Sequence, residues 1–292
     1  MRSEVESKAL IFVHMFRSGG STLNRIMDWE YSPQRIFSVN GRYCRWGYRK
    51  LTEIPSPVLA RMQVFRGHMP VGLHKFLPQP STYITLLRDP VKRILSEYFA
   101  GFTRLSHRQH RVIKELSVPQ FVSTLANNNA QTKMIAGLSN SYDFLAEECT
   151  EQTLAAAKTN LCERFSLVGI TEQFESTLAL AKCILGWNVP RYTSFNSTRK
   201  PAMAISPETR RFIAEHNRFD VELYQYAVGL FNEALARHAE EISGTADAVR
   251  RARLAGGSRL FYYRTASTAL KLLGLTTSTA LSMMSARRSS FA

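Results

Sequence analysis

The chain has 292 residues, 45% of them hydrophobic, so it can bury a sizeable core as one large or two small domains. Its 38 basic and 23 acidic residues give a net charge of +15, which favours anionic partners. Charge alone does not choose among nucleotides, sulfated glycans, nucleic acids and membrane surfaces. The four cysteines have neither metal-ligand spacing nor the density of a disulfide scaffold, and they indicate reduced thiols.

The N-terminal segment before the first apolar run contains acidic residues and leaves no room for a signal peptide or a membrane anchor. We therefore expect a cytoplasmic protein.

Residues 10–13 form an apolar run that is typical of a strand buried on both faces. Behind them, apolar residues recur at helical spacing after Ser21 and Thr22, which are good capping residues. Gly19 and Gly20 allow the backbone to approach a ligand closely, and the start of a helix attracts anions. The pattern predicts a strand, an anion-binding loop and a helix. A plain turn is the alternative, because glycine and serine also mark ordinary turns.

The rest of the chain alternates between strand and helix patterns. Buried strands are predicted at residues 63–66, 82–88 and 166–171. Helices are predicted from Pro90, with Asp89 as its cap, and at 118–125, 151–163, 172–186, 207–217 and 221–238. Irregular structure or short helices are expected at 31–48, and an interrupted loop at 127–133. The alternation predicts an α/β fold of three layers with a central, mostly parallel sheet.

In the helix that begins at Pro90, apolar residues fall on one face. Lys92, Arg93, Ser96 and Glu97 are expected on the other.

We expect one domain over residues 1–242 and a basic, low-complexity tail over 243–292. The tail has eight basic residues against one acidic residue, and charges at Arg264 and Lys271 interrupt its apolar stretch. A membrane-spanning helix is therefore not expected. A disordered tail and a helix lying on a membrane surface are the two interpretations left open.

Two stretches together resemble the cofactor-binding elements of sulfotransferases that use 3′-phosphoadenosine 5′-phosphosulfate (PAPS). They are His-Met-Phe-Arg-Ser-Gly-Gly-Ser-Thr at 14–22 and Leu-Leu-Arg-Asp-Pro-Val-Lys-Arg-Ile-Leu-Ser-Glu-Tyr at 86–98. Gly-His-Met-Pro-Val-Gly at 67–72 is similar to a segment of the branch that contains heparan sulfate 2-O- and 6-O-sulfotransferases and their bacterial relatives. The resemblance covers about residues 8–235 and implies a P-loop, nucleotide-kinase-like sulfotransferase fold.

The resemblance also implies a cofactor site. Arg88 and Ser96 would bind the 3′-phosphate. Arg88 leaves the end of a predicted strand with a planar set of donors, and Ser96 lies two helical turns further on. A salt bridge of Arg88 with Asp89 or Glu97 is the alternative. The 5′-phosphosulfate would be held by the loop residues Arg17, Ser18, Gly19, Gly20, Ser21 and Thr22.

His68 is the expected general base, because its ordinary pKa suits proton transfer and it aligns with the catalytic histidine of the resembled family. His74 competes for this role, and with Gln131 and Lys133 it forms a weaker group of candidates on the substrate side. His14 is expected to be a packed or hydrogen-bonded core residue.

Phe16-Arg17 stands where the family usually has Pro-Lys. Arg17 keeps the positive charge that would stabilise the leaving phosphate, but it is a poor proton donor. Two outcomes stay open: either charge stabilisation suffices, or activity is reduced.

We therefore expect a sulfotransferase that moves the sulfuryl group from PAPS to a hydroxyl, on a glycan or glycoconjugate, by in-line displacement and without a metal. One alternative is a weakly active or inactive protein of the same fold that binds anionic glycans or nucleic acid, although nucleic acid is the less expected partner. A nucleotide-dependent kinase is the other, and it would need a magnesium-binding acid pair and a Gly-Lys-Ser/Thr sequence that the loop lacks.

Overall fold

The computed structural model describes residues 8–39, 48–103, 110–124, 128–137, 147–188 and 204–243. At its centre is a 5-stranded sheet in the order β2-β3-β1-β4-β5, with every neighbouring pair parallel. The strands are β1 (Ala9–Val13), β2 (Ile36–Ser38), β3 (Val64–Gly67), β4 (Ser81–Leu87) and β5 (Phe165–Ile170). The predicted α/β fold with a central parallel sheet is confirmed.

Strand β1 lies in the middle of the sheet and is buried along its whole length, as its unbroken apolar sequence predicts. Leu10 pairs with Val64 of β3 on one side and with Thr82 of β4 on the other. The chain continues from β1 to β2 on one side of the sheet and from β4 to β5 on the other. The carboxyl ends of β1 and β4 therefore flank a topological switch point, where α/β sheets build their sites.

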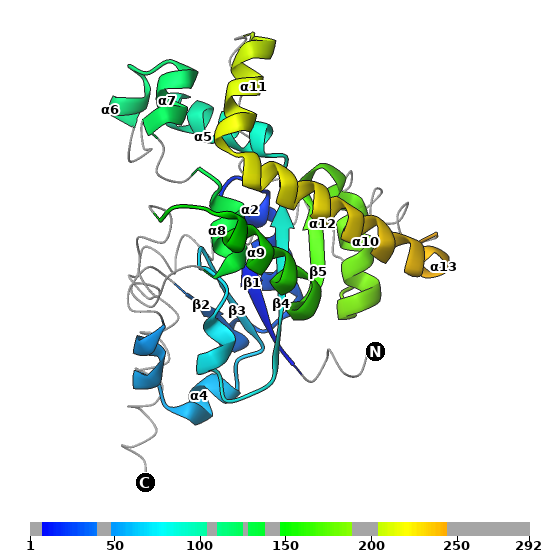
Figure 1. Ribbon diagram of the computed structural model, residues 1–292. Coiled ribbons are helices and arrows are strands. Elements are labelled where there is room, and N and C mark those ends of the chain that lie inside the picture. Colours follow the sequence, from blue (N-terminus) through cyan, green and yellow to red (C-terminus); the bar gives the residue numbers. More distant parts are fainter. Residues whose placement is uncertain are drawn as a thin grey trace.

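Helices flank the sheet, and in Figure 1 helices α8 and α9 cross in front of it while the long helix α12 runs past its upper end. The longer helices are α2 (Gly20–Glu30), α5 (Pro90–Thr103), α9 (Glu151–Arg164), α10 (Phe174–Leu185), α11 (Pro207–His216) and α12 (Arg218–Arg237). The shorter ones are α4 (Ser56–Ala60), α6 (His110–Ile113), α7 (Val118–Thr124), α8 (Ala130–Ala136) and α13 (Ala239–Ile242).

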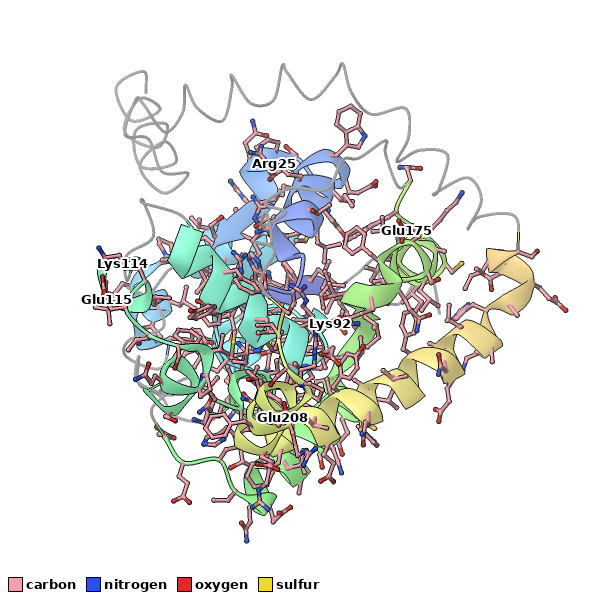
Figure 2. All side chains as sticks on the ribbon, turned by 90° about the horizontal axis from the view of Figure 1, so that it is seen from above. Arg25, Lys92, Lys114, Glu115, Glu175 and Glu208 are labelled. Carbon is pink, nitrogen blue, oxygen red and sulfur yellow. The ribbon has the colours of Figure 1, made fainter. Side chains whose placement is uncertain are left out.

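A second apolar cluster supports helix α5 beyond the sheet. Helices α5, α6, α7 and α11 gather there, at the top of Figure 1. Their shared core consists of Ile94, Leu95, Tyr98, Phe99, Ile113, Val118, Phe121, Val122 and Ile213. Side chains fill the space between the elements, and charged pairs such as Lys114–Glu115, at 3.3 Å, lie at the periphery (Figure 2).

The predicted loop at 127–133 is wrong where the structure describes it, because helix α8 begins at Ala130. Asn129 Oδ1 accepts hydrogen bonds from the backbone N–H groups of Phe219 and Asp220, each at 3.1 Å. In return, Asp220 accepts from the backbone N–H groups of Gln131 at 3.3 Å and Thr132 at 2.8 Å. Helices α8 and α12 thus cap each other. The carboxylate that caps α8 comes from a residue distant in sequence, because the local sequence supplies no such capping group.

Two further predictions need correction. Residues 36–38 form strand β2 at the edge of the sheet, within a region predicted to be irregular or helical, because three residues are too few to show a period. Arg93, expected on the polar face of α5, is 0% exposed, and its Nη2 lies 3.7 Å from Asp220 Oδ2. Arg93 is therefore covered by α12 rather than by water, whereas Lys92 on the same face of α5 is exposed.

One predicted segment, the tail beyond Ser243, lies outside the described residues. The boundary between domain and tail stays a prediction. Within the described ranges, no helix combines the length and the apolar character needed to cross a membrane.

We predict that Asp220→Ala lowers the free energy of unfolding by about 3–5 kcal/mol, because it leaves the buried Arg93 charge without its counter-ion and removes the cap of α8. Urea unfolding measures this loss. Glu233→Ala, an exposed change on the same helix, should stay within about 0.5 kcal/mol of the wild type. A loss below about 1 kcal/mol for Asp220→Ala would contradict the role assigned to this carboxylate.

Candidate functional site

The loop after β1 makes a tight turn into helix α2. Arg17 and Gly19 both have positive φ angles, 61° and 78°, and Gly19 is the N-cap without a side-chain capping bond. Helix α2 begins at Gly20, so the prediction that Ser21 and Thr22 cap it is wrong: both lie in its first turn. This turn contains no acidic residue. The positive end of the helix dipole is thus not neutralised from within the helix, which favours an anionic ligand.

Thr171 ties the loop to the sheet from the residue directly after β5. Its Oγ1 lies 2.9 Å from the carbonyl oxygen of Ser18 and 2.9 Å from that of Leu87. Ser18 is 1% exposed and donates its hydroxyl to the carbonyl of Phe16 at 3.3 Å. The loop is therefore held by the ends of β4 and β5 as well as by its own strand.

Three residues predicted at the cofactor site meet beside this loop. The Nε and Nη2 atoms of Arg17 donate to Ser96 Oγ at 3.2 and 3.1 Å. Arg88 Nη1 donates to the carbonyl of Arg17 at 2.6 Å. Arg88 Nε is buried without a hydrogen-bond partner, so its guanidinium retains donor capacity. The β1 loop, the end of β4 and helix α5 thus converge on one cationic, hydrogen-bonding site.

Gln131 holds the main chain of Arg88. Its Oε1 accepts from the Arg88 N–H at 2.9 Å, and its Nε2 donates to the Arg88 carbonyl at 2.9 Å. Gln131 is predicted on the substrate side, but it is only 1% exposed. Its amide group contacts the protein itself, through the main chain of Arg88. The ion-pair partner of the Arg88 side chain is Glu172, with 4.0 Å between Nε and Oε1, and not Asp89 or Glu97 as in the alternative interpretation. Asp89 instead caps α5, as predicted, by accepting from the Lys92 N–H at 2.8 Å.

Lys133, another candidate for the substrate side, is buried in helix α8. Burial lowers its pKa, while the nearby Cys149, Asp220 and Glu147 oppose this shift.

His74 lies near the amino-terminal ends of strands β4 and β5, whereas the loop lies at the carboxyl-terminal ends of the strands. Its Nδ1 is 2.8 Å from the hydroxyl of Tyr83 near the start of β4, and Arg164, directly before β5, donates to its Nε2 at 3.3 Å. Burial lowers the pKa of His74, and the charges of Arg164 and Lys75 lower it further. The structure does not bring His74 to the loop.

His68 follows β3 at the same edge of the sheet as the loop. Its Nδ1 lies 2.7 Å from the carbonyl oxygen of His14, which can only accept, so Nδ1 carries the proton and Nε2 is the proton-accepting nitrogen of the neutral ring. The residue is exposed, but its ring stacks between His14 and Phe16. This removal from water lowers the pKa of His68, while the hydrogen bond to His14 and the charge of Glu97 raise it.

His14 is packed and hydrogen-bonded, as the sequence predicts. Asn24 Nδ2 donates to its Nδ1 at 3.3 Å. Burial, followed by the charges of His68 and Arg66, lowers the pKa of His14 from 6.5 to about 3. His14 is therefore neutral at physiological pH, and His68 protonates before it.

Sequence reasoning did not single out Thr171 as a support of the loop or Phe16 as the cover of His68. Thr171 carried a usable signal, because it is the last residue of a predicted buried strand, and parallel strands end at one edge of a sheet. The stacking of Phe16 on His68 had no sequence signal, since it joins residues that only the sheet brings together.

The donor set fits a ligand with two anionic groups. The N-terminus of α2 and Arg17 suit one group, while Arg88 and Ser96 suit the other. Among the described residues, no group of three or more His, Cys, Asp or Glu could hold a metal ion. That the reaction needs no metal stays a prediction.

The sequence profile of the galactose-3-O-sulfotransferase family matches residues 42–272, more than half of the chain. Heparan-sulfate 6-O-sulfotransferase 1 of Cricetulus griseus is 31% identical over 280 residues, covering 77% of this chain and 67% of the relative. The mouse (Mus musculus) protein of the same name is 31% identical over 280 residues, covering 77% of this chain and 66% of the relative. Heparan-sulfate 6-O-sulfotransferase 2 of Danio rerio is 32% identical over 177 residues, covering 51% of this chain and 38% of the relative.

The chain therefore belongs to the galactose-3-O-sulfotransferase family, and the resemblance to PAPS-dependent sulfotransferases drawn from its motifs is confirmed. Its parallel sheet flanked by helices is consistent with the sulfotransferase fold. The alignments with the curated relatives named above span between 38% and 67% of those proteins' own length.

The lowered pKa of His14 predicts a pH dependence of stability. Between pH 6 and pH 4 the unfolded chain binds a proton at residue 14 that the folded protein does not, so stability falls as pH falls. One such proton corresponds to about 1.4 kcal/mol per pH unit. In His14→Phe, the free energy of unfolding should therefore depend on pH less steeply by about this amount. Urea unfolding at several pH values measures the slope, and parallel slopes in the two proteins would contradict a neutral, buried His14.

Proposed function

We propose that this protein transfers the sulfuryl group of PAPS to a hydroxyl group of a glycan. The observation that carries the proposal is the convergence of Arg17, Arg88 and Ser96 on a helix N-terminus at the sheet edge where His68 lies. Membership of the galactose-3-O-sulfotransferase family and the names of the curated relatives support the same class of reaction and acceptor.

In this proposal the N-terminus of α2 and Arg17 would hold the 5′-phosphosulfate of PAPS, and Arg88 with Ser96 would hold its 3′-phosphate. The guanidinium of Arg88 suits a phosphate because it offers planar, paired donors, and its Nε makes no hydrogen bond within the protein. Gln131 keeps this side chain in place through the main chain of Arg88.

His68 is the general base. Its Nε2 accepts the proton of the acceptor hydroxyl as that oxygen attacks sulfur, while Nδ1 remains bonded to the carbonyl of His14. PAPS, when bound, supplies a sulfuryl group on a phosphate leaving group. Arg17 and the N-terminus of α2 stabilise the negative charge that this phosphate gains, so no proton donor is needed on that side. The positive charge of Arg17, rather than its acidity, is what the reaction uses.

The acceptor is a hexose hydroxyl in this proposal. The matched family is described as acting at the 3-hydroxyl of galactose, and the relatives are described as acting at the 6-hydroxyl of heparan sulfate. The net charge of +15 also favours an acidic glycan over a neutral one.

We predict that the protein binds 3′-phosphoadenosine 5′-phosphate at least about tenfold more tightly than AMP, and that Arg88→Ala removes most of this difference. Hydrogen bonds to charged groups contribute about 1.5–3 kcal/mol, which corresponds to roughly 10- to 150-fold in affinity. Isothermal titration calorimetry measures both ligands. Arg237→Ala, which removes an equal charge at the far end of α12, should bind like the wild type. Equal affinity of the wild type for the two nucleotides would refute a PAPS site.

A second prediction concerns turnover. His68→Gln should lower kcat by about 10²- to 10⁴-fold, because it removes the proton acceptor, while the affinity for 3′-phosphoadenosine 5′-phosphate stays within about threefold of the wild type. Transfer of ³⁵S-sulfate from PAPS to desulfated heparan sulfate and to a β-galactoside measures the rate and separates the two acceptors. Unchanged turnover in His68→Gln would exclude His68 as the base. Salt-sensitive glycan binding without any transfer would favour a binding protein instead.

A further inference from the structure

Four rings form a continuous stack beside the loop. Phe12 and His14 stack with centroids 5.3 Å apart, His14 and His68 follow at 4.2 Å, and His68 and Phe16 at 4.3 Å. The planes of His68 and Phe16 differ by only 8°. Phe12 of β1 and, after that strand, His14 and Phe16 thus contribute alternate rings, and His68, which follows β3, is inserted between the last two.

His14 is wedged between His68 and helix α2. A Cβ atom built on Gly20 would lie 2.1 Å from His14 Cδ2, so the imidazole needs a glycine at the start of that helix. Asn24 holds the other side of the ring through Nδ1. Arg66 fixes Asn24 and its helix by donating to the Asn24 carbonyl at 2.8 Å and to Asp28 Oδ1 at 2.6 Å. The ring of His14 therefore has little freedom to move away from His68.

We propose that His14 and Phe16 are positioning residues that clamp the ring of His68, keeping Nδ1 on the carbonyl of His14 and Nε2 as the proton acceptor. The catalytic meaning of the clamp rests on the proposed function, whereas the clamp itself belongs to the ligand-free protein. Rings at 4.2 and 4.3 Å on both faces prevent the imidazole from tilting, and a flip that exchanged its nitrogens would need both rings to separate.

The charges around the clamp favour protonation of His68 and disfavour protonation of His14. Arg66, on β3, faces His14 and disfavours its protonation. Glu97, on α5, faces His68 and favours protonation there. The proton taken from an acceptor hydroxyl is therefore held on His68 and is not passed on to His14.

The clamp can be tested in the ligand-free protein by ¹⁵N NMR of labelled histidine side chains, which reports the tautomer and the pKa of each ring. In the wild type, His68 should be the Nδ1–H tautomer. Phe16→Leu keeps an apolar side chain but no ring, so we expect a mixture of tautomers and a pKa closer to 6.5. Phe16→Tyr, which keeps the ring, should restore the wild-type tautomer and pKa.

Kinetics provide a second readout. Phe16→Leu should lower kcat by about tenfold or more with less than a threefold change in the KM for PAPS, and should move the acidic limb of the pH–rate profile to higher pH. His14→Ala should change the His68 tautomer in the same direction, and if that variant does not fold, Phe16→Leu alone decides. An unchanged tautomer and pKa of His68 in Phe16→Leu would overturn the inference. A wild-type protein with the Nδ1–H tautomer but without sulfuryl transfer would instead overturn the proposed function and leave the clamp standing.

Discussion

Backbone hydrogen bonds hold β1 between β3 and β4 with all three strands parallel, and the contacts of the loop depend on this pairing. Because parallel strands end at one edge, His68, Arg88 and the loop at 17–20 come together although they are far apart in sequence. Strand β5 adds Thr171 to the same edge, where its hydroxyl reaches the loop. A register change in β1 would separate all of these groups at once, since each is placed by the strand that precedes it.

The two cationic side chains of the site are arranged by hydrogen bonds to neutral groups more than by opposite charges, since Arg17 donates to the hydroxyl of Ser96. Arg88 donates to the carbonyl of Arg17, and Gln131 bonds both main-chain groups of Arg88. Gln131 is in turn fixed by Asp220, which caps helix α8. A route of buried hydrogen bonds thus runs from α12 to the loop, so the packing of distant helices determines where Arg88 points.

The two histidines at the loop share a stack but differ in chemistry. His14 is kept neutral by burial and by neighbouring positive charge, whereas His68 is exposed and bonded through Nδ1 to a carbonyl. One ring therefore acts as a rigid support and the other can take up a proton. Phe16 contributes to this division by covering the second face of His68 at the position where the sequence departs from the family pattern.

The sequence by itself determined the buried strands at 10–13 and 82–88, the α/β alternation, the cap at Asp89 and the family, because each rests on residues that are close together in the chain. It also predicted that Arg17, Arg88, Ser96 and His68 lie at one functional site. Only the tertiary structure decided that Gln131 clamps Arg88, that His74 lies at the other edge of the sheet, that Arg93 is buried and that residues 130–136 are helical. These features depend on partners at least 43 residues away in the chain, such as Asp220 for α8 and for Arg93, and local periodicity carries no information about partners at such separations.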